Sequence, residues 1–438
     1  MVNLGFFIQS LMSKQIRFCC TLLFVFSAIY GVNAQTDASN ARSDSLDIIH
    51  TDINLEVHDF NGKSIRGDAV VTLVAKMNNI THVNLDLLKL TVDSVVTGKS
   101  KLTFAYNDTL LRVNLLTTLN LGDSVRLTIF YRGVPKIDQS NWGGFYFNAG
   151  YAFNLGVGFA ADPHNYGRVW FPCFDNFVER STYLFNIFTS AGKKAHCSGY
   201  LVSENTVSGD TIVRTWKMDE PVPSYLVGLA VAEYETVHMT YNGISGNVPI
   251  ELAAKSSDTN NAKSAFIHLN DAMAAFEFNF GPFLFNKVGY SFVPFGSGAM
   301  EHASNIAYPL YAIGGGSIGT ETLMAHELAH HWWGNLVTCR TAEDMWINEG
   351  MASYCEQLFL EYTYGADTFR TVRKDNLDAV LQYAHVREDF HRAVSGVPHE
   401  YTYGMHVYDK GAVVAHNVRA YLGDSLYRSG MKYFLNKY

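Results

Sequence analysis

The most constraining feature of this 438-residue chain is a short histidine motif followed at a distance by a glutamate. The run His326-Glu327-Leu328-Ala329-His330 places two histidines four positions apart, so on a helix both side chains project from one face. Glu349 follows nineteen residues after the second histidine. Two His and one Glu leave one position of a tetrahedral zinc ion open for water, which is typical of catalytic rather than structural zinc. We therefore predict one Zn²⁺ per chain, bound by His326, His330 and Glu349.

The residues beside these ligands have separate expected roles. His331 lies about 100° further round the helix than His330, so it cannot replace that ligand. Glu327 is expected to accept the proton of the metal-bound water as general base. Glu356 comes seven residues after Glu349 on the same helix face. It could orient a zinc-bound histidine, and a solvated acid is the equal alternative.

Length and composition fit a globular protein of several domains. Apolar residues make up 48% of the chain and aromatic residues 14%, which is enough for large cores. The formal net charge is -8 and no cluster of Lys and Arg occurs, so nucleic acid is not an expected partner. The glycines at 314–316 are not followed by Gly-Lys-Ser/Thr, so we interpret them as a turn and not as a phosphate-binding loop.

The first 34 residues are expected to be a signal peptide. Lys14 and Arg17 precede an apolar run over 18–32, and small residues over 32–34 form a cleavage site before Gln35. This run is short for a transmembrane span, and an uncleaved anchor is the alternative. We expect an exported protein, secreted, periplasmic or at the cell surface, with no stable membrane span once the signal is removed.

Four cysteines remain after signal removal, in a compartment expected to be oxidising. Their order along the chain suggests that Cys173 pairs with Cys197 and Cys339 with Cys355. Four cysteines allow three pairings, however, and free buried thiols are the alternative.

The pattern of apolar residues changes near residue 245. Before it, apolar and polar residues alternate in short runs such as 52–57, 69–75 and 124–131, which indicates strands. After it we predict helices over 262–280, 320–336 (with Thr320 as the cap), 405–422 and 431–438, and a strand over 287–293. We therefore expect a β-rich domain over 45–245 and a metal-binding domain over 246–438.

Three further segments complete a pattern that resembles a known family. They are Gly298-Ala299-Met300-Glu301, Trp346-Ile347-Asn348-Glu349-Gly350 and Phe171-Pro172-Cys173-Phe174-Asp175. With the histidine motif, these segments resemble the aminopeptidase N family of gluzincin zinc metallopeptidases, which also includes the leukotriene-epoxide hydrolase. The resemblance implies a multidomain α+β fold, in which an N-terminal β-saddle domain precedes a thermolysin-like catalytic domain. It also implies a later helical domain that 246–438 does not contain, so we expect a catalytic domain truncated at its C-terminal end.

The resemblance assigns further site residues. Glu301 would bind the free α-amine of the substrate, and the preceding Gly298, Ala299 and Met300 would belong to the same substrate-binding segment. Tyr408 is similar to the family tyrosine whose phenol hydrogen-bonds the oxyanion of the tetrahedral intermediate.

The chain also departs from the family pattern. His302 stands where Asn is more usual after the glutamate, which is expected to alter the first substrate pocket. Relatives often supply a second acidic or amide residue to the amine site from the segment that aligns with 158–163, where Asp162 is a possible substitute.

Together these features predict a zinc aminopeptidase that removes N-terminal residues from peptides with a free amine. An epoxide hydrolase on the same scaffold and an inactive or partial zinc-binding fragment are the alternatives. The sequence indicates neither an oligomeric state nor a preference for one N-terminal side chain.

Overall fold

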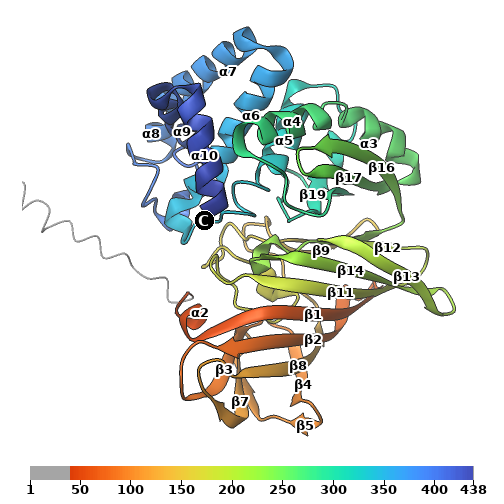
Figure 1. Ribbon diagram of the computed structural model, residues 1–438. Coiled ribbons are helices and arrows are strands. Elements are labelled where there is room, and N and C mark those ends of the chain that lie inside the picture. The colour runs from red at the N-terminus through yellow and green to blue at the C-terminus, as the bar shows by residue number, and fades with distance from the viewer. Residues whose placement is uncertain (1–39, 438) are drawn as a thin grey trace, which may run out of the picture. The chain divides into compact units, whose positions relative to one another are not determined.

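The computed structural model describes residues 40–437, and the signal peptide expected over 1–34 lies outside them. A β-rich N-terminal part is followed by a part that is mostly helical (Figure 1). This order confirms the α+β fold class. Strands predicted over 52–57, 69–75 and 124–131 all form within longer strands.

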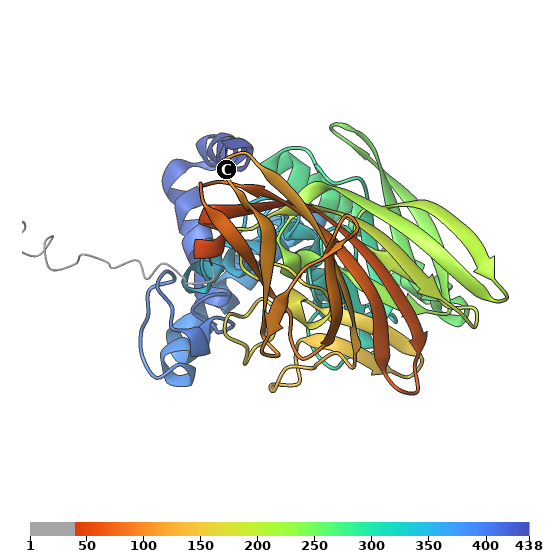
Figure 2. The same cartoon turned by 90° about the horizontal axis from the view of Figure 1, so that it is seen from below.

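An eight-stranded sheet dominates the N-terminal part, in the order β13-β14-β11-β1-β2-β8-β4-β5. Its strands are β1 Leu46–Asp59, β2 Ser64–Ala75, β4 Thr91–Thr97, β5 Ser100–Lys101, β8 Ser124–Gly133, β11 Ser181–Thr189, β13 Tyr200–Ser208 and β14 Thr211–Val222. Every second residue of β11 is buried, as expected for a strand with one face on the core. Figure 2 looks onto these strands, with β1 and β2 in red and orange.

Two smaller sheets complete the N-terminal part. One contains β3 Ile80–Asp86, β6 Phe104–Tyr106 and β7 Leu110–Leu119. The other has the order β12-β15-β10-β9, with β9 Gly144–Asn148, β10 Tyr151–Leu155, β12 Lys194–Cys197 and β15 Leu229–Ala232. All residues of β10 and β15 are buried, so both faces of this sheet are covered.

A four-stranded sheet opens the second part. It comprises β16 Tyr234–Gly243, β17 Gly246–Lys255, β18 Val288–Val293 and β19 Ile306–Pro309, and β18 is parallel to both of its neighbours. The boundary expected between 245 and 246 falls in the turn of the β16–β17 hairpin. Both strands of this hairpin belong to the second sheet, so we place the start of that sheet at Tyr234.

The helices cover this sheet and extend beyond it. They are α3 Thr259–Ala265, α4 Leu269–Phe280, α5 Ile318–Ala329, α6 Glu349–Tyr364, α7 Ala366–Ala379, α8 His385–Arg387, α9 Asp409–Leu422 and α10 Asp424–Lys437, with the short α2 Ala41–Ser45 at the start of the described residues. Helix α6 is central, because it contacts α4, α5, α7 and α9 (Figure 1). Within residues 40–437, no helix combines the length and apolar character needed to cross a membrane.

Several predicted helix bounds are wrong. The helix expected over 262–280 is broken into α3 and α4 at 266–268, while those expected over 405–422 and 431–438 begin at Asp409 and Asp424. The helix expected over 320–336 ends at Ala329, and its cap is Ser317, whose Oγ accepts from the Thr320 N–H at 3.2 Å. Gly334, four residues after the second histidine, then takes a φ of +130°, which turns the chain.

The cysteine pairings suggested by chain order do not form, and the alternative of free buried thiols describes the structure. Cys173, Cys197, Cys339 and Cys355 are all buried free thiols. They are enclosed in different parts of the core: Cys173 bridges to the end of β3, Cys197 ends β12 and Cys355 lies within α6.

Buried hydrogen bonds hold the two parts together beside the histidine motif. The Gly199 N–H donates to Ser304 Oγ at 2.7 Å, and Asn305 Nδ2 donates to the His196 carbonyl at 3.0 Å. We call this region, where the loop between β18 and β19 meets the N-terminal part, the seam. Its hydrogen bonds hold Ser304 and Asn305, which follow Glu301 in this loop.

Candidate metal centre

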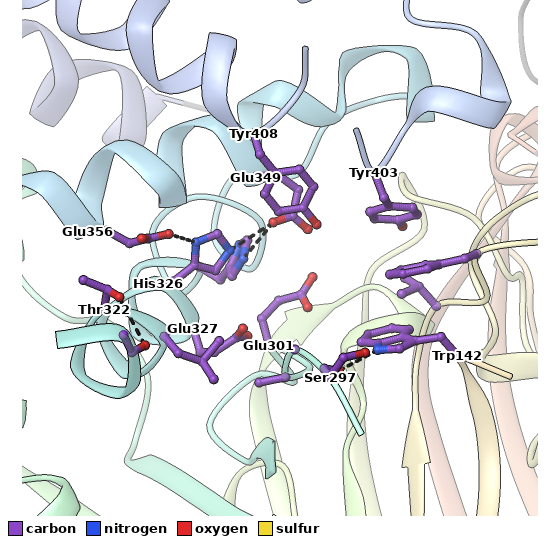
Figure 3. A pocket seen from close by; sticks show the side chains of 17 residues that line it. Trp142, Ser297, Glu301, Thr322, His326, Glu327, Glu349, Glu356, Tyr403 and Tyr408 are labelled. Carbon is purple, nitrogen blue, oxygen red and sulfur yellow. Dashed lines mark hydrogen bonds and ion pairs between the residues drawn. The ribbon is translucent and has the colours of Figure 1, made fainter. Parts of the chain in front are cut away.

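The three predicted metal ligands lie together in the fold. Helix α5 carries His326, and His330 is its C-cap, while Glu349 is the first residue of α6, which packs against α5. Glu349 Oε2 lies 3.1 Å from His326 Nε2 and 3.3 Å from His330 Nε2. Zinc bonds of about 2.0–2.1 Å in a tetrahedron place neighbouring donor atoms about 3.3 Å apart. The donor set therefore fits zinc in both chemistry and spacing (Figure 3).

The other nitrogen of each histidine ring is held by an acceptor. His326 Nδ1 lies 2.7 Å from Glu356 Oε1, and His330 Nδ1 lies 2.9 Å from the Trp333 carbonyl oxygen. Carboxylate and carbonyl oxygens only accept hydrogen bonds, so each Nδ1 carries the proton and each Nε2 keeps a lone pair for a metal. Of the two roles considered for Glu356, this contact supports the orienting one.

His331 faces away from these ligands. Its Nε2 accepts from the Ser304 N–H at 3.0 Å, and its Nδ1 lies 3.1 Å from the Leu328 carbonyl oxygen. Burial lowers the pKa of His331 to about 3, so the ring stays neutral. It supports the seam and is unavailable to a metal.

Glu327 is a buried carboxylate with an unused oxygen. It lines the same cavity as the ligands, and among residues 40–437 its Oε2 has no hydrogen-bond partner. Burial raises the pKa of Glu327 to about 8, while His326 and His330 act in the opposite direction. A buried acceptor that faces a cavity without a partner is suited to take a proton from a bound molecule.

The start of α6 is positioned by the residues that flank Glu349. Asn348 Oδ1 accepts from the Cys339 N–H at 3.0 Å, and Asn348 Nδ2 donates to the Tyr225 hydroxyl at 3.2 Å. Gly350 meets Gly411 of α9 so closely that a Cβ added at Gly350 would lie 2.7 Å from the Gly411 Cα. The two helices can therefore cross here only because both residues are glycines.

This crossing brings the N-terminus of α9 over the ligands. Tyr408 is the residue before α9, and its ring lies 6.0 Å from the His326 ring at an interplanar angle of 14°. Burial, and next the charge of Glu349, raise the pKa of Tyr408. The phenol therefore keeps its proton and can donate a hydrogen bond into the cavity (Figure 3).

Glu301 is held on the opposite side of the cavity by its backbone. Met300 exchanges two hydrogen bonds of 3.0 Å with Ala307, and Asn335 Nδ2 donates to the Glu301 carbonyl at 3.0 Å. Glu301 is 7% exposed, and burial raises its pKa whereas the charge of His330 lowers it. Glu301, Glu327 and His330 each offer an atom within 4.8 Å of the others.

Two of the three residues before Glu301 occupy the expected place. Gly298 and Ala299 line the cavity, while the side chain of Met300 is fully buried in the core. The substrate-binding role predicted for Met300 is therefore wrong for its side chain. Its backbone pairs with Ala307 in an isolated bridge, and its side chain is enclosed in the core away from the cavity.

The two departures from the family pattern lie away from the cavity. Asn154 Nδ2 lies 3.2 Å from His302 Nε2, and the His302 side chain packs against Gly228, so it does not shape the first pocket as expected. Asp162 is exposed and does not line the cavity either. Its neighbour Phe159 does so instead.

The cavity that joins these groups has a volume of about 450 Å³. Among its aromatic lining residues, sequence reasoning missed Trp142, Phe159 and Tyr403. Tyr403 is one of 25 tyrosines, so its position along the chain carried no signal. Its hydroxyl is buried and has no hydrogen-bond partner within the described residues.

Comparison with known proteins gives matches over both parts of the chain. Residues 46–226 match the family described as the Peptidase M1 N-terminal domain, and residues 269–438 match the Peptidase family M1 domain. Glutamyl aminopeptidase from Bos taurus is 30% identical over 205 residues, which are 44% of this chain and 21% of that protein. Endoplasmic reticulum aminopeptidase 1 from Homo sapiens is 26% identical over 298 residues, 62% of this chain and 30% of that protein. The chain thus spans less than a third of either relative.

Solved structures share the fold over nearly the whole chain. The M1 zinc metallopeptidase from Deinococcus radiodurans superimposes with a TM-score of 0.79 at 22% identity, covering 90% of this chain and 86% of that one. Yeast LTA4 hydrolase gives a TM-score of 0.73 at 20% identity, covering 90% and 62%. The two M1 domains match one after the other along the chain, and the second contains the zinc-ligand set. The chain therefore belongs to peptidase family M1.

Proposed function

We propose that this protein is a zinc-dependent aminopeptidase that hydrolyses the N-terminal residue from peptides. The observation that carries the proposal is the buried Glu301 carboxylate, which shares one cavity with the zinc ligands and Glu327. A fixed anion at this distance from the metal ligands suits the ammonium group of a peptide N-terminus. The aminopeptidase relatives support this reading, as does a Deinococcus radiodurans M1 structure bound to a Tyr-Ser-Ala substrate.

Each of these residues of the cavity has its own role in the proposed reaction. A zinc ion bound by the three ligands would polarise the scissile carbonyl and acidify the attacking water. Glu327 Oε2 accepts one proton of that water while the water oxygen bonds to the carbonyl carbon. Glu327 then passes this proton to the amine nitrogen, which leaves when the C–N bond breaks. Tyr408 donates a hydrogen bond to the carbonyl oxygen as that oxygen gains negative charge. Glu301 fixes which peptide bond lies at the reacting position.

Epoxide hydrolysis is a weaker reading of the same site. A lipid epoxide would need a long apolar tunnel, whereas the lining of this cavity includes four glutamates: Glu301, Glu327, Glu349 and Glu356. An inactive fragment is also a weaker reading, since the general base, the phenol and the ligand set are all in place.

We also propose that the protein is exported, on the basis of the signal-like pattern that ends before Gln35. N-terminal sequencing of the mature protein should begin at Gln35. Retention of residues 18–32 would instead support a membrane anchor.

Blocking the substrate amine tests the proposed function. The purified protein should cleave a free-amine peptide and leave its N-acetylated counterpart nearly intact, because acetylation removes the charge that Glu301 pairs with. The loss in kcat/KM should be at least about tenfold, as expected when a buried charged group is left unpaired. Glu301→Ala should reduce this difference while zinc content stays unchanged. Equal cleavage of the free and blocked peptides by the unmodified protein would exclude an aminopeptidase.

A further inference from the structure

Three stacked aromatic rings, which we call the aromatic wall, form one side of the cavity. The ring centroids of Trp142 and Phe159 lie 4.4 Å apart at an interplanar angle of 10°. Those of Phe159 and Tyr403 lie 4.5 Å apart at 24°. In Figure 3, Trp142 and Tyr403 lie on the same side of the pocket, across from Glu356 and Thr322.

The aromatic wall is held in place by contacts outside the stack. Trp142 Nε1 donates to the Ser297 carbonyl oxygen at 2.8 Å, and the ring of His164 packs edge-on against Tyr403 at 5.0 Å. Its rings come from three separate loops, before β9, after β10 and before α9. Phe159 is nevertheless 38% exposed, so an apolar surface is preorganised and left open.

The position of the aromatic wall relates it to one part of a peptide. A substrate whose amine pairs with Glu301 and whose first carbonyl faces the zinc ligands has its first Cα between these two points. The side chain on that Cα must therefore lie within the same cavity, which the aromatic wall lines. Ser297, which holds the Trp142 indole, is only four residues before Glu301.

The charged groups of the cavity do not offer a second partner for that side chain. Its described lining residues include no lysine or arginine, so an acidic side chain would find no cationic side chain of that kind and would be repelled by the carboxylates. A basic side chain on the aromatic wall would also lack a free partner beside it, since Glu356, whose side chain is 31% exposed, lies across the pocket. Glu301 serves the amine, Glu349 the metal and Glu327 the water, while Glu356 contacts His326.

We propose that the cavity selects substrates whose N-terminal residue has a large aromatic side chain, which packs on Trp142, Phe159 and Tyr403. The inference rests on the proposed function, because it takes the amine to be bound by Glu301. Rejection of acidic N-terminal residues follows from the same geometry.

Hydrolysis of aminoacyl p-nitroanilides with Phe, Leu, Ala, Arg and Glu tests the proposal. On the zinc-loaded protein, kcat/KM for Phe should exceed that for Ala by at least about tenfold, since even one methylene in an apolar pocket is worth about 10- to 200-fold. The Glu substrate should be the slowest. A rate for Arg or Glu equal to that for Phe, or equal rates for Phe and Ala, would overturn the proposal while leaving the aminopeptidase function intact. No hydrolysis of any substrate would instead mean that the proposed function itself is wrong.

Variants of Phe159 locate the preference. Phe159→Ala should lower the Phe-to-Ala ratio of kcat/KM at least about tenfold, because it removes a ring on which the side chain of the Phe substrate packs. Phe159→Tyr keeps an aromatic ring and should retain the ratio, and Tyr403→Phe should do the same. If Phe159→Ala does not fold, as judged by zinc content and thermal unfolding, Phe159→Leu takes its place with a smaller reduction expected. An unchanged ratio in a folded Phe159 variant without the ring would overturn the proposal.

Discussion

The cavity and the seam lie on two sides of the chain at His330 and His331, and both contain buried polar groups. The two regions differ in whether these groups have hydrogen-bond partners. On the seam side, His331 uses both ring nitrogens, and Ser304 both accepts and donates hydrogen bonds. On the cavity side, Glu327 Oε2 and the Tyr403 hydroxyl are buried without partners within the described residues.

For these groups, the difference separates those that support the fold from those that face the cavity. A buried polar atom without a partner costs about 1–3 kcal/mol, so it is retained only where something else repays that cost. His330 and His331 are adjacent in sequence, yet the first faces the ligands and the second supports the fold. The same residue type thus has two roles, which its hydrogen-bond partners reveal.

Loss of a ligand should produce the largest effect. His326→Ala or Glu349→Ala removes one of only three protein ligands, so zinc content should fall from about one per chain to nearly none, with activity lost. His331→Asn is the matched control, because it changes the neighbouring histidine on the seam side and should keep its zinc. Elemental analysis of the folded proteins checks this. Full zinc content in both ligand variants would contradict the assignment.

Glu327→Gln should separate metal binding from catalysis. The amide fills the same space but cannot accept the proton of the water, so kcat should fall by about 10²- to 10⁴-fold while zinc stays bound. Steady-state kinetics together with zinc analysis measure both quantities. A variant with near-normal kcat would show that the unpaired Glu327 oxygen marks something other than a general base.

Tyr408→Phe should cause the next largest loss. Removal of one hydrogen-bond donor to the developing oxyanion typically lowers kcat by about 10²- to 10³-fold. KM should change little, because the hydrogen bond forms mainly in the transition state. The matched control is Tyr401→Phe, which removes an exposed hydroxyl that donates to Asp389 outside the cavity. An equal decrease of kcat in the two variants would contradict the proposal that Tyr408 donates to the oxyanion.

The sequence predicted those parts of the site that depend on helical geometry. A spacing of four residues places His326 and His330 on one face whatever the rest of the chain does. The crossing of Gly350 and Gly411 could not be predicted, because it joins two helices far apart in the sequence. For the same reason the aromatic wall was missed, since stacking of Phe159 on Tyr403 depends on how two loops meet in space. The early end of α5 was missed because the helical pattern of apolar residues continues past Gly334.

The smallest expected effect lies at the seam and concerns pH. His302 is 1% exposed, and burial lowers its pKa to about 3, whereas the pKa of a histidine in an unfolded chain is about 6.5. Between these values the unfolded chain binds a proton that the folded chain excludes, so stability should fall as pH drops below about 6.5. His302→Asn removes this contribution, and its stability should change less between pH 7 and pH 4.5 than that of the unmodified protein. Urea unfolding at several pH values measures both slopes, and His238→Asn, at a side chain that is 72% exposed, is the control that should keep the original slope. Identical slopes for His302→Asn and the unmodified protein would show that the seam tolerates a charged imidazole, and the contrast between seam and cavity would then fail at this residue.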